Sequence, residues 1–105
     1  MVEFIESREE FIKIVKDSRA VVIHFSTHVR ASKNMINDAL DNFSDESEFT
    51  AIGFYQIDVG KMEEVAEEQQ VSDLPTVLFF KAGKKVGTVV GPEIDEILDH
   101  LIELA

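Results

Sequence analysis

The chain has 105 residues, of which 45 % are apolar and eight are phenylalanine, which is enough for one compact core. Its 21 acidic and 10 basic residues give a formal net charge of −11, so its average field repels nucleic acids and anionic lipid headgroups. We therefore expect neither a nucleic-acid nor a membrane partner. The absence of cysteine excludes disulfides, thiolate catalysis, iron–sulfur clusters and thiolate zinc sites.

Targeting and linker signals are absent from the sequence. The N-terminal MVEFIESREE is acidic where a secretory signal is basic and then apolar, and no apolar run reaches the roughly 18 residues that a membrane helix needs. No repeat and no Pro/Gly/Ser-rich stretch interrupts the chain. We expect a single domain over residues 1–105, located in the cytoplasm.

The N-terminal part predicts a strand followed by a helix. Residues 2–5 alternate like a short strand, and residues 7–10, Ser-Arg-Glu-Glu, have the form of a helix capping box. The helix that follows has its apolar stripe at Phe11, Ile12, Ile14 and Val15.

The middle of the chain predicts two strands and two helices. Residues 20–26, AVVIHFS, are a nearly continuous β-branched and aromatic run, typical of a central strand buried on both faces. Residues 51–59 predict another strand, and Gly60 begins an acidic helix. The inward positions of the two helices are Met35, Ile36, Ala39, Leu40 and Phe43 in the first, and Met62, Val65 and Ala66 in the second.

The C-terminal part predicts a hairpin and a last helix. Residues 76–81 and 85–90 read as strands, and the connection Ala82-Gly83-Lys84 between them is too short for anything but an antiparallel pair. Pro92 suits the first turn of a final helix. That helix has its apolar positions at Ile94, Ile97, Leu98, Leu101 and Ile102. The element order predicts an α/β protein with a mixed five-stranded sheet flanked by four helices.

Short segments along the whole chain carry a resemblance to a known family. They are VEFIES at 2–7, VVIHFS at 21–26, Met35-Ile36, Ile57-Asp58-Val59, Val65-Ala66, Leu74-Pro75-Thr76, Phe79-Phe80-Lys81, Gly83, Lys85-Val86-Gly87 and Gly91. In residue type and spacing these segments resemble animal-type thioredoxins. The resemblance implies a thioredoxin fold.

The resemblance breaks at the redox motif. The family's Trp-Cys-Gly-Pro-Cys falls on Val29, Arg30, Ala31, Ser32 and Lys33, so both cysteine positions carry cations. The family's reaction needs one thiolate to attack a disulfide and a second thiol to resolve the mixed disulfide. We therefore expect a redox-inactive protein that is not an enzyme and needs no cofactor.

The resemblance also implies that a peptide-binding groove is retained. Pro75 matches the family's cis-proline, and the groove beside it is lined by Val29, Asp73, Leu74 and Gly91. In the family, the backbone before this proline pairs with an extended peptide. We expect the chain to bind an extended segment of a partner protein in this groove. The alternative is a structural or regulatory subunit, a monomer or weak homodimer, that uses another face.

The loop that replaces the redox motif carries positive charge in an acidic chain. Arg30, Ser32 and Lys33 stand where the family's second helix begins, so they form a candidate site for a carboxylate or phosphate. The alternative is that these side chains are solvated and bind nothing.

His24 occupies the strand position at which the family keeps a buried Asp. It is either a pH sensor, a metal ligand paired with His28, or a neutral core imidazole with one hydrogen bond. No third nitrogen ligand is evident, because His100 falls on the last predicted helix. We therefore expect no metal site.

Overall fold

The computed structural model describes residues 2–27 and 35–105. The strands are β1 (Glu3–Phe4), β2 (Ala20–Ser26), β3 (Gly53–Asp58), β4 (Thr76–Lys81) and β5 (Lys84–Val90). The helices are α1 (Arg8–Asp17), α2 (Met35–Ser44), α3 (Glu63–Glu68) and α4 (Ile94–Leu104), with a short 3-10 helix η1 (Ser47–Phe49) after α2. Strands and α-helices follow one another in the predicted order. No helix in the described ranges is long and apolar enough to cross a membrane.

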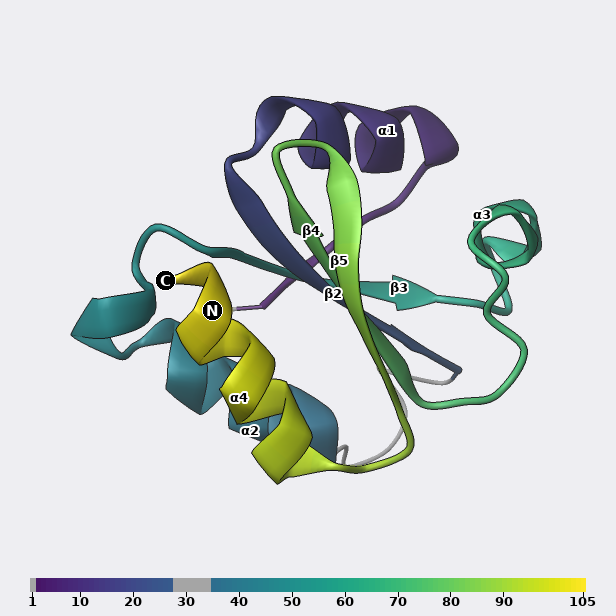
Figure 1. The fold of residues 1–105 in the computed structure, drawn as a ribbon. Coiled ribbons are helices and arrows are strands. Elements are labelled where there is room, and N and C mark those ends of the chain that lie inside the picture. The colour runs from purple at the N-terminus through teal and green to yellow at the C-terminus, as the bar shows by residue number, and fades with distance from the viewer. Residues whose placement is uncertain (1, 28–34) are drawn as a thin grey trace.

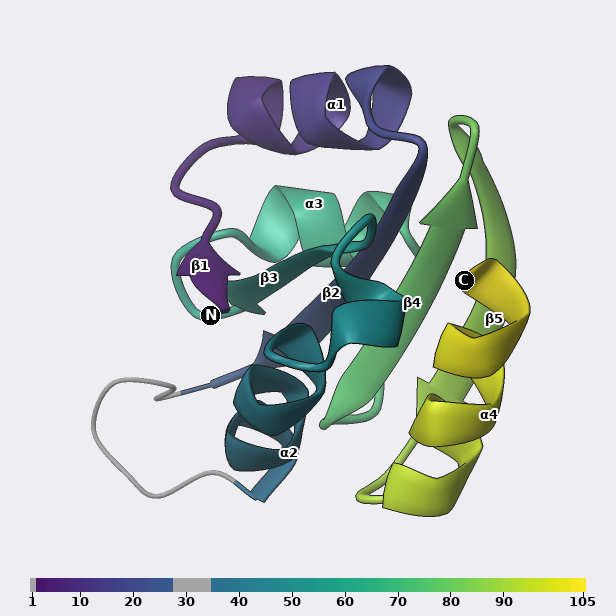
Figure 2. The same cartoon turned by 90° about the vertical axis from the view of Figure 1, so that its left-hand side faces the viewer.

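The five strands form one mixed sheet in the order β1-β3-β2-β4-β5. The pairs β1–β3 and β3–β2 are parallel, whereas β2–β4 and β4–β5 are antiparallel. Helices α1 and α3 lie on one face of the sheet, and α2 and α4 lie on the other (Figures 1 and 2). The predicted mixed five-stranded sheet flanked by four helices is confirmed.

Strand β2 is the centre of the core because both of its faces are covered. Its first six residues are buried, as the run AVVIHF predicts. Ile23 and Phe25 pack with α1 and α3, while Val22 packs with α2 and α4. Each face therefore has its own apolar cluster, and β2 contributes to both.

The starts of two predicted elements in the middle of the chain differ from the sequence expectation. Strand β3 begins at Gly53 rather than at residue 51, because Ile52 N–H donates to Phe49 C=O at 3.0 Å in a turn. Helix α3 begins at Glu63 rather than at Gly60, whose N–H donates to Asp58 Oδ1 at 3.0 Å and closes another turn.

The other corrections lie in the C-terminal part. The hairpin turn has two residues rather than three, since Lys84 already pairs with Lys81. Ala82 and Gly83 both have positive φ, +52° and +83°, as a tight two-residue hairpin turn requires. Pro92 is not in the first turn of α4; it precedes the N-cap residue Glu93, whose N–H donates to Gly91 C=O at 2.8 Å.

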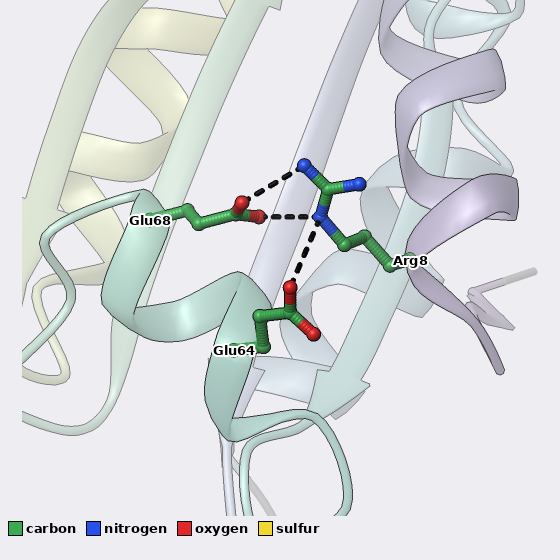
Figure 3. A network of polar contacts seen from close by, with 3 residues as sticks. All are labelled: Arg8, Glu64 and Glu68. Atoms are coloured by element: carbon green, nitrogen blue, oxygen red, sulfur yellow. Dashed lines mark hydrogen bonds and ion pairs between the residues drawn. The ribbon is translucent and has the colours of Figure 1, made fainter.

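The two helices on the α1/α3 face are joined by an exposed ion-pair network (Figure 3). Arg8 Nε and Nη2 donate to the two carboxylate oxygens of Glu68, each at 2.8 Å. Glu64 Oε1 lies 3.7 Å from Arg8 Nε. The hydrogen bond from Arg8 lowers the pKa of Glu68. Because these side chains are solvated, the network adds little stability.

Helix α4 packs closely on β5 because one strand position lacks a side chain. A Cβ atom at Gly87 would lie 2.6 Å from both Cε1 and Nδ1 of His100. The His100 ring stacks on Phe79, with ring centroids 4.7 Å apart and an interplanar angle of 22°. Gly87 therefore leaves the space in which His100 covers Phe79.

We predict that Gly87→Ala lowers the free energy of unfolding by about 1 kcal/mol, because the added methyl group displaces His100 from Phe79. In a His100→Ala background the same change should cost nothing, since the methyl group then has room. Urea unfolding of the four proteins in this double-mutant cycle measures both values. An equal loss in the two backgrounds would contradict the packing account.

Candidate functional site

Four of the five predicted groove residues lie in the described part of the chain, and the structure brings them together. Asp73, Leu74 and Pro75 lead into β4, and Gly91 follows β5. The peptide bond between Leu74 and Pro75 is cis. Gly91 N–H donates to Pro75 C=O at 2.8 Å, and Thr76 Oγ1 donates to Asp73 C=O. These bonds hold the connection before β4 against the end of β5.

Leu74 is exposed, and its backbone is free of hydrogen bonds to the described residues. The residue is 40 % exposed, although it is large and apolar. Within residues 2–27 and 35–105, no hydrogen bond uses the N–H or C=O of Leu74. An exposed residue with an open donor and an open acceptor can pair with one residue of an extended strand.

A small hollow lies beside this connection, and its lining includes Thr76 and Val90, which the sequence did not assign to the groove. It has a volume of about 150 Å³, and Asp73 also lines it. Val90 pairs with Thr76 across the hairpin and is 52 % exposed. Leu74 and Val90 are therefore two exposed apolar side chains on neighbouring segments. The adjacent Val89 is buried, so the two neighbouring valines face opposite sides of the strand.

The predicted positions of the former redox motif fall outside the described residues. Val29, the fifth groove residue, is among them. The candidate anion site at Arg30, Ser32 and Lys33 also lies there, as does His28. These assignments stay predictions.

His24 lies in a buried polar chain that links three elements. The His24 side chain is fully buried, and its Nδ1 lies 2.8 Å from Asn37 Oδ1 on α2. Asn37 Nδ2 donates to Gln56 Oε1 on β3, the strand beside β2. Because the amide of Asn37 presents its oxygen to the ring, Nδ1 carries the proton of the neutral imidazole. His24 Nε2 is buried and has no partner among the described residues.

Sequence reasoning did not identify Asn37 or Gln56 as partners of His24. Two signals were available: Gln56 is a polar residue in the middle of an apolar strand, and Asn37 stands three residues before the inward Leu40. Across residues 2–27 and 35–105, no group of three His, Asp or Glu side chains is arranged to hold a metal.

Burial lowers the pKa of His24, and the hydrogen bond with Asn37 offsets this only in part. Protonation would place a charge at the buried Nε2, together with an N–H that has no acceptor within residues 2–27 and 35–105. The neutral form therefore stabilises the fold fully above about pH 6.5, the ordinary pKa of histidine in an unfolded chain. This stabilisation is lost as the pH falls below that value through the folded-state pKa.

We predict that the parent protein loses more free energy of unfolding between pH 7 and pH 5 than His24→Gln does, because the variant removes the titrating group. Urea unfolding at both pH values measures the two losses. His100→Gln is the matched control on α4. Its free energy of unfolding should fall between pH 7 and pH 5 by as much as that of the parent. Equal losses in the parent and in His24→Gln would show that His24 does not couple protonation to stability.

Comparisons with known proteins agree with this fold and sequence. Residues 2–103 match the family model described as thioredoxin. The chain is 33 % identical over 92 residues to thioredoxin of Malassezia sympodialis, covering 88 % of each protein. It is also 33 % identical over 91 residues to thioredoxin-1 of Saccharomyces cerevisiae, covering 87 % of this chain and 86 % of that protein.

Solved structures show the same architecture. The crystal structure of Malassezia sympodialis thioredoxin has a TM-score of 0.88 at 30 % identity and covers 99 % of this chain and 94 % of its own. The oxidised thioredoxin from Plasmodium falciparum, at 23 % identity, has a TM-score of 0.87 over 100 % of this chain and 99 % of its own, which supports the fold alone. The chain therefore belongs to the thioredoxin family and has its fold, although it contains no cysteine.

Proposed function

We propose that this chain is a redox-inactive thioredoxin-like protein that binds an extended segment of a partner protein. The segment lies across Val29, Asp73, Leu74, Pro75 and Gly91. Dithiol–disulfide exchange needs two sulfur atoms in the motif, and Arg30 and Lys33 stand in their place. The chemistry of the family is thus removed while the residues beside its proline remain.

The open backbone of Leu74 is the observation that carries this proposal. Its N–H and C=O are not used by the described part of the chain, whereas the neighbouring Pro75 C=O and Asp73 C=O both accept hydrogen bonds. The N–H and C=O of Leu74 can therefore form hydrogen bonds with one residue of an extended segment that adds as a strand. Main-chain pairing of this kind supplies affinity without requiring a particular partner sequence.

Side chains around Leu74 supply the selectivity in this proposal. Leu74 and Val90 are exposed and apolar, so they favour apolar side chains on the bound segment. Asp73 lines the adjacent hollow and is exposed, so it disfavours an acidic residue there. Arg30 and Lys33 add positive charge on the motif side and favour acidic residues at that end of the segment.

We predict that Leu74→Asp reduces partner capture from a native lysate by about tenfold or more, because it places a charge in an apolar contact. Ile102→Asp is the matched control: Ile102 is 55 % exposed and lies in the last turns of α4. Capture with the parent and both variants, each checked by thermal melting, measures the effect.

Partners retained by Ile102→Asp and lost by Leu74→Asp would support the groove. Partners retained equally by both variants would contradict it and would move the interaction to another face. Self-association of the chain, seen as concentration-dependent sedimentation and kept by Leu74→Asp, would instead favour a homodimer that leaves the groove unused.

A further inference from the structure

Positive charge is concentrated in two short segments of this acidic chain. Lys16 and Arg19 lie in residues 16–19, and Lys81, Lys84 and Lys85 lie in residues 81–85. These five are half of the ten basic residues of the chain, and Asp17 is the one acidic residue within the two segments. The rest of the chain holds five basic and 20 of the 21 acidic residues. The charge is therefore strongly asymmetric along the sequence.

The fold brings the two segments together at one end of the sheet. Ala82 N–H in the hairpin turn donates to Arg19 C=O at 2.9 Å, and Lys81 pairs with Ala20 in the β2–β4 ladder. Figures 1 and 2 both show the hairpin turn beside the last turn of α1. All five basic residues are exposed. We call Lys16, Arg19, Lys81, Lys84 and Lys85 the basic pole.

One member of the basic pole already has a partner within the chain. Lys85 Nζ donates to Gln69 C=O at 3.1 Å, on the α1/α3 face of the sheet. Lys81 and Arg19, in contrast, border a hollow where the start of β2 meets η1 and the end of α4. These two cations are the members of the basic pole that line this hollow, so a ligand in the hollow would lie beside them.

The hollow beside Arg19 and Lys81 has a mainly apolar lining. Its volume is about 400 Å³, and Ala20, Ile52 and Leu104 contribute to its wall. Glu48 is the one acidic side chain among its lining residues. A hollow of this size accepts one large apolar side chain, and the two cations at its edge favour carboxylates beside that side chain.

Arg19 and Lys81 are remote from the groove at Leu74, although Lys85 lines the hollow beside Asp73. Strand β4 has six residues, with Thr76 next to Pro75 at one end and Lys81 at the other. At about 3.3 Å per residue, Thr76 and Lys81 are roughly 17 Å apart along this strand. One bound residue cannot contact both Leu74 and Lys81, so the groove and the hollow at Lys81 can each hold a ligand.

We propose that the basic pole docks an acidic segment of a protein, with one apolar side chain in the hollow and carboxylates facing Arg19 and Lys81. A protein segment fits better than a nucleic acid or an anionic membrane, because the remaining surface is strongly acidic and repels an extended array of phosphates. Glu48 lines the same hollow, so an apolar side chain rather than an anionic group enters it, and the carboxylates of the segment stay at the edge beside Arg19 and Lys81. This surface goes beyond the groove and gives the chain two docking sites at opposite ends of β4.

The test uses a fluorescein-labelled peptide in which two runs of glutamate flank a single phenylalanine. We expect fluorescence anisotropy to show binding that weakens with salt and about tenfold with Lys81→Glu. Lys61→Glu makes the same change in net charge at an exposed residue before α3 and should change affinity by less than about twofold. Leu74→Asp should leave the affinity unchanged.

A second peptide with glycine in place of phenylalanine should bind more weakly, since it leaves the hollow empty. Several results would overturn the proposal: no binding of the first peptide at millimolar concentration, equal weakening by Lys81→Glu and Lys61→Glu, or loss of binding in Leu74→Asp. Tighter binding to phosphatidylserine vesicles or to a single-stranded oligonucleotide, lost in Lys81→Glu, would assign the basic pole to a lipid or nucleic acid instead. Thermal melting of each variant confirms that it is folded.

Discussion

The complete burial of β2 is the constraint on which the rest of this structure depends. This strand is bonded to β3 on one side and to β4 on the other, and it supplies side chains to the apolar clusters on both faces of the sheet. Near its end, Phe25 pairs with Thr76 beside the groove, and its first residue, Ala20, lines the hollow at the basic pole. Both proposed binding surfaces are therefore positioned by one rigid element.

A thioredoxin fold without cysteine lacks the two sulfur atoms on which the family's dithiol–disulfide exchange depends. The open backbone of Leu74 and the cations around Lys81 lie at opposite ends of β4, so the two proposed ligands would not compete for the same residues. In the core between them, burial lowers the pKa of His24, which is hydrogen-bonded to Asn37 and through Asn37 to Gln56. If both proposals hold, the chain links two protein segments through one sheet.

The sequence predicts the fold well because local patterns and tertiary packing agree. The run AVVIHFS specifies a doubly buried strand, and Ser7 caps α1 by accepting a hydrogen bond from Glu10 N–H, as the capping box predicts. The ends of β3 and α3 could not be placed, since they depend on turn hydrogen bonds such as Gly60 N–H to Asp58 Oδ1. The groove residues came from the family resemblance, and the open backbone of Leu74 is visible only in three dimensions. The contact of residues 16–19 with residues 81–85 joins segments far apart in the chain, which no local pattern encodes.

The most direct test of the central claim is amide hydrogen exchange of the protein alone and in complex with the segment that it captures. If the segment adds a strand at the groove, the Leu74 amide should exchange more slowly in the complex, because its N–H then donates to the backbone of the bound segment. Amides at the far end of α4 should be unchanged. Unaltered exchange at Leu74, with protection appearing elsewhere on the surface, would contradict the account and assign binding to another face.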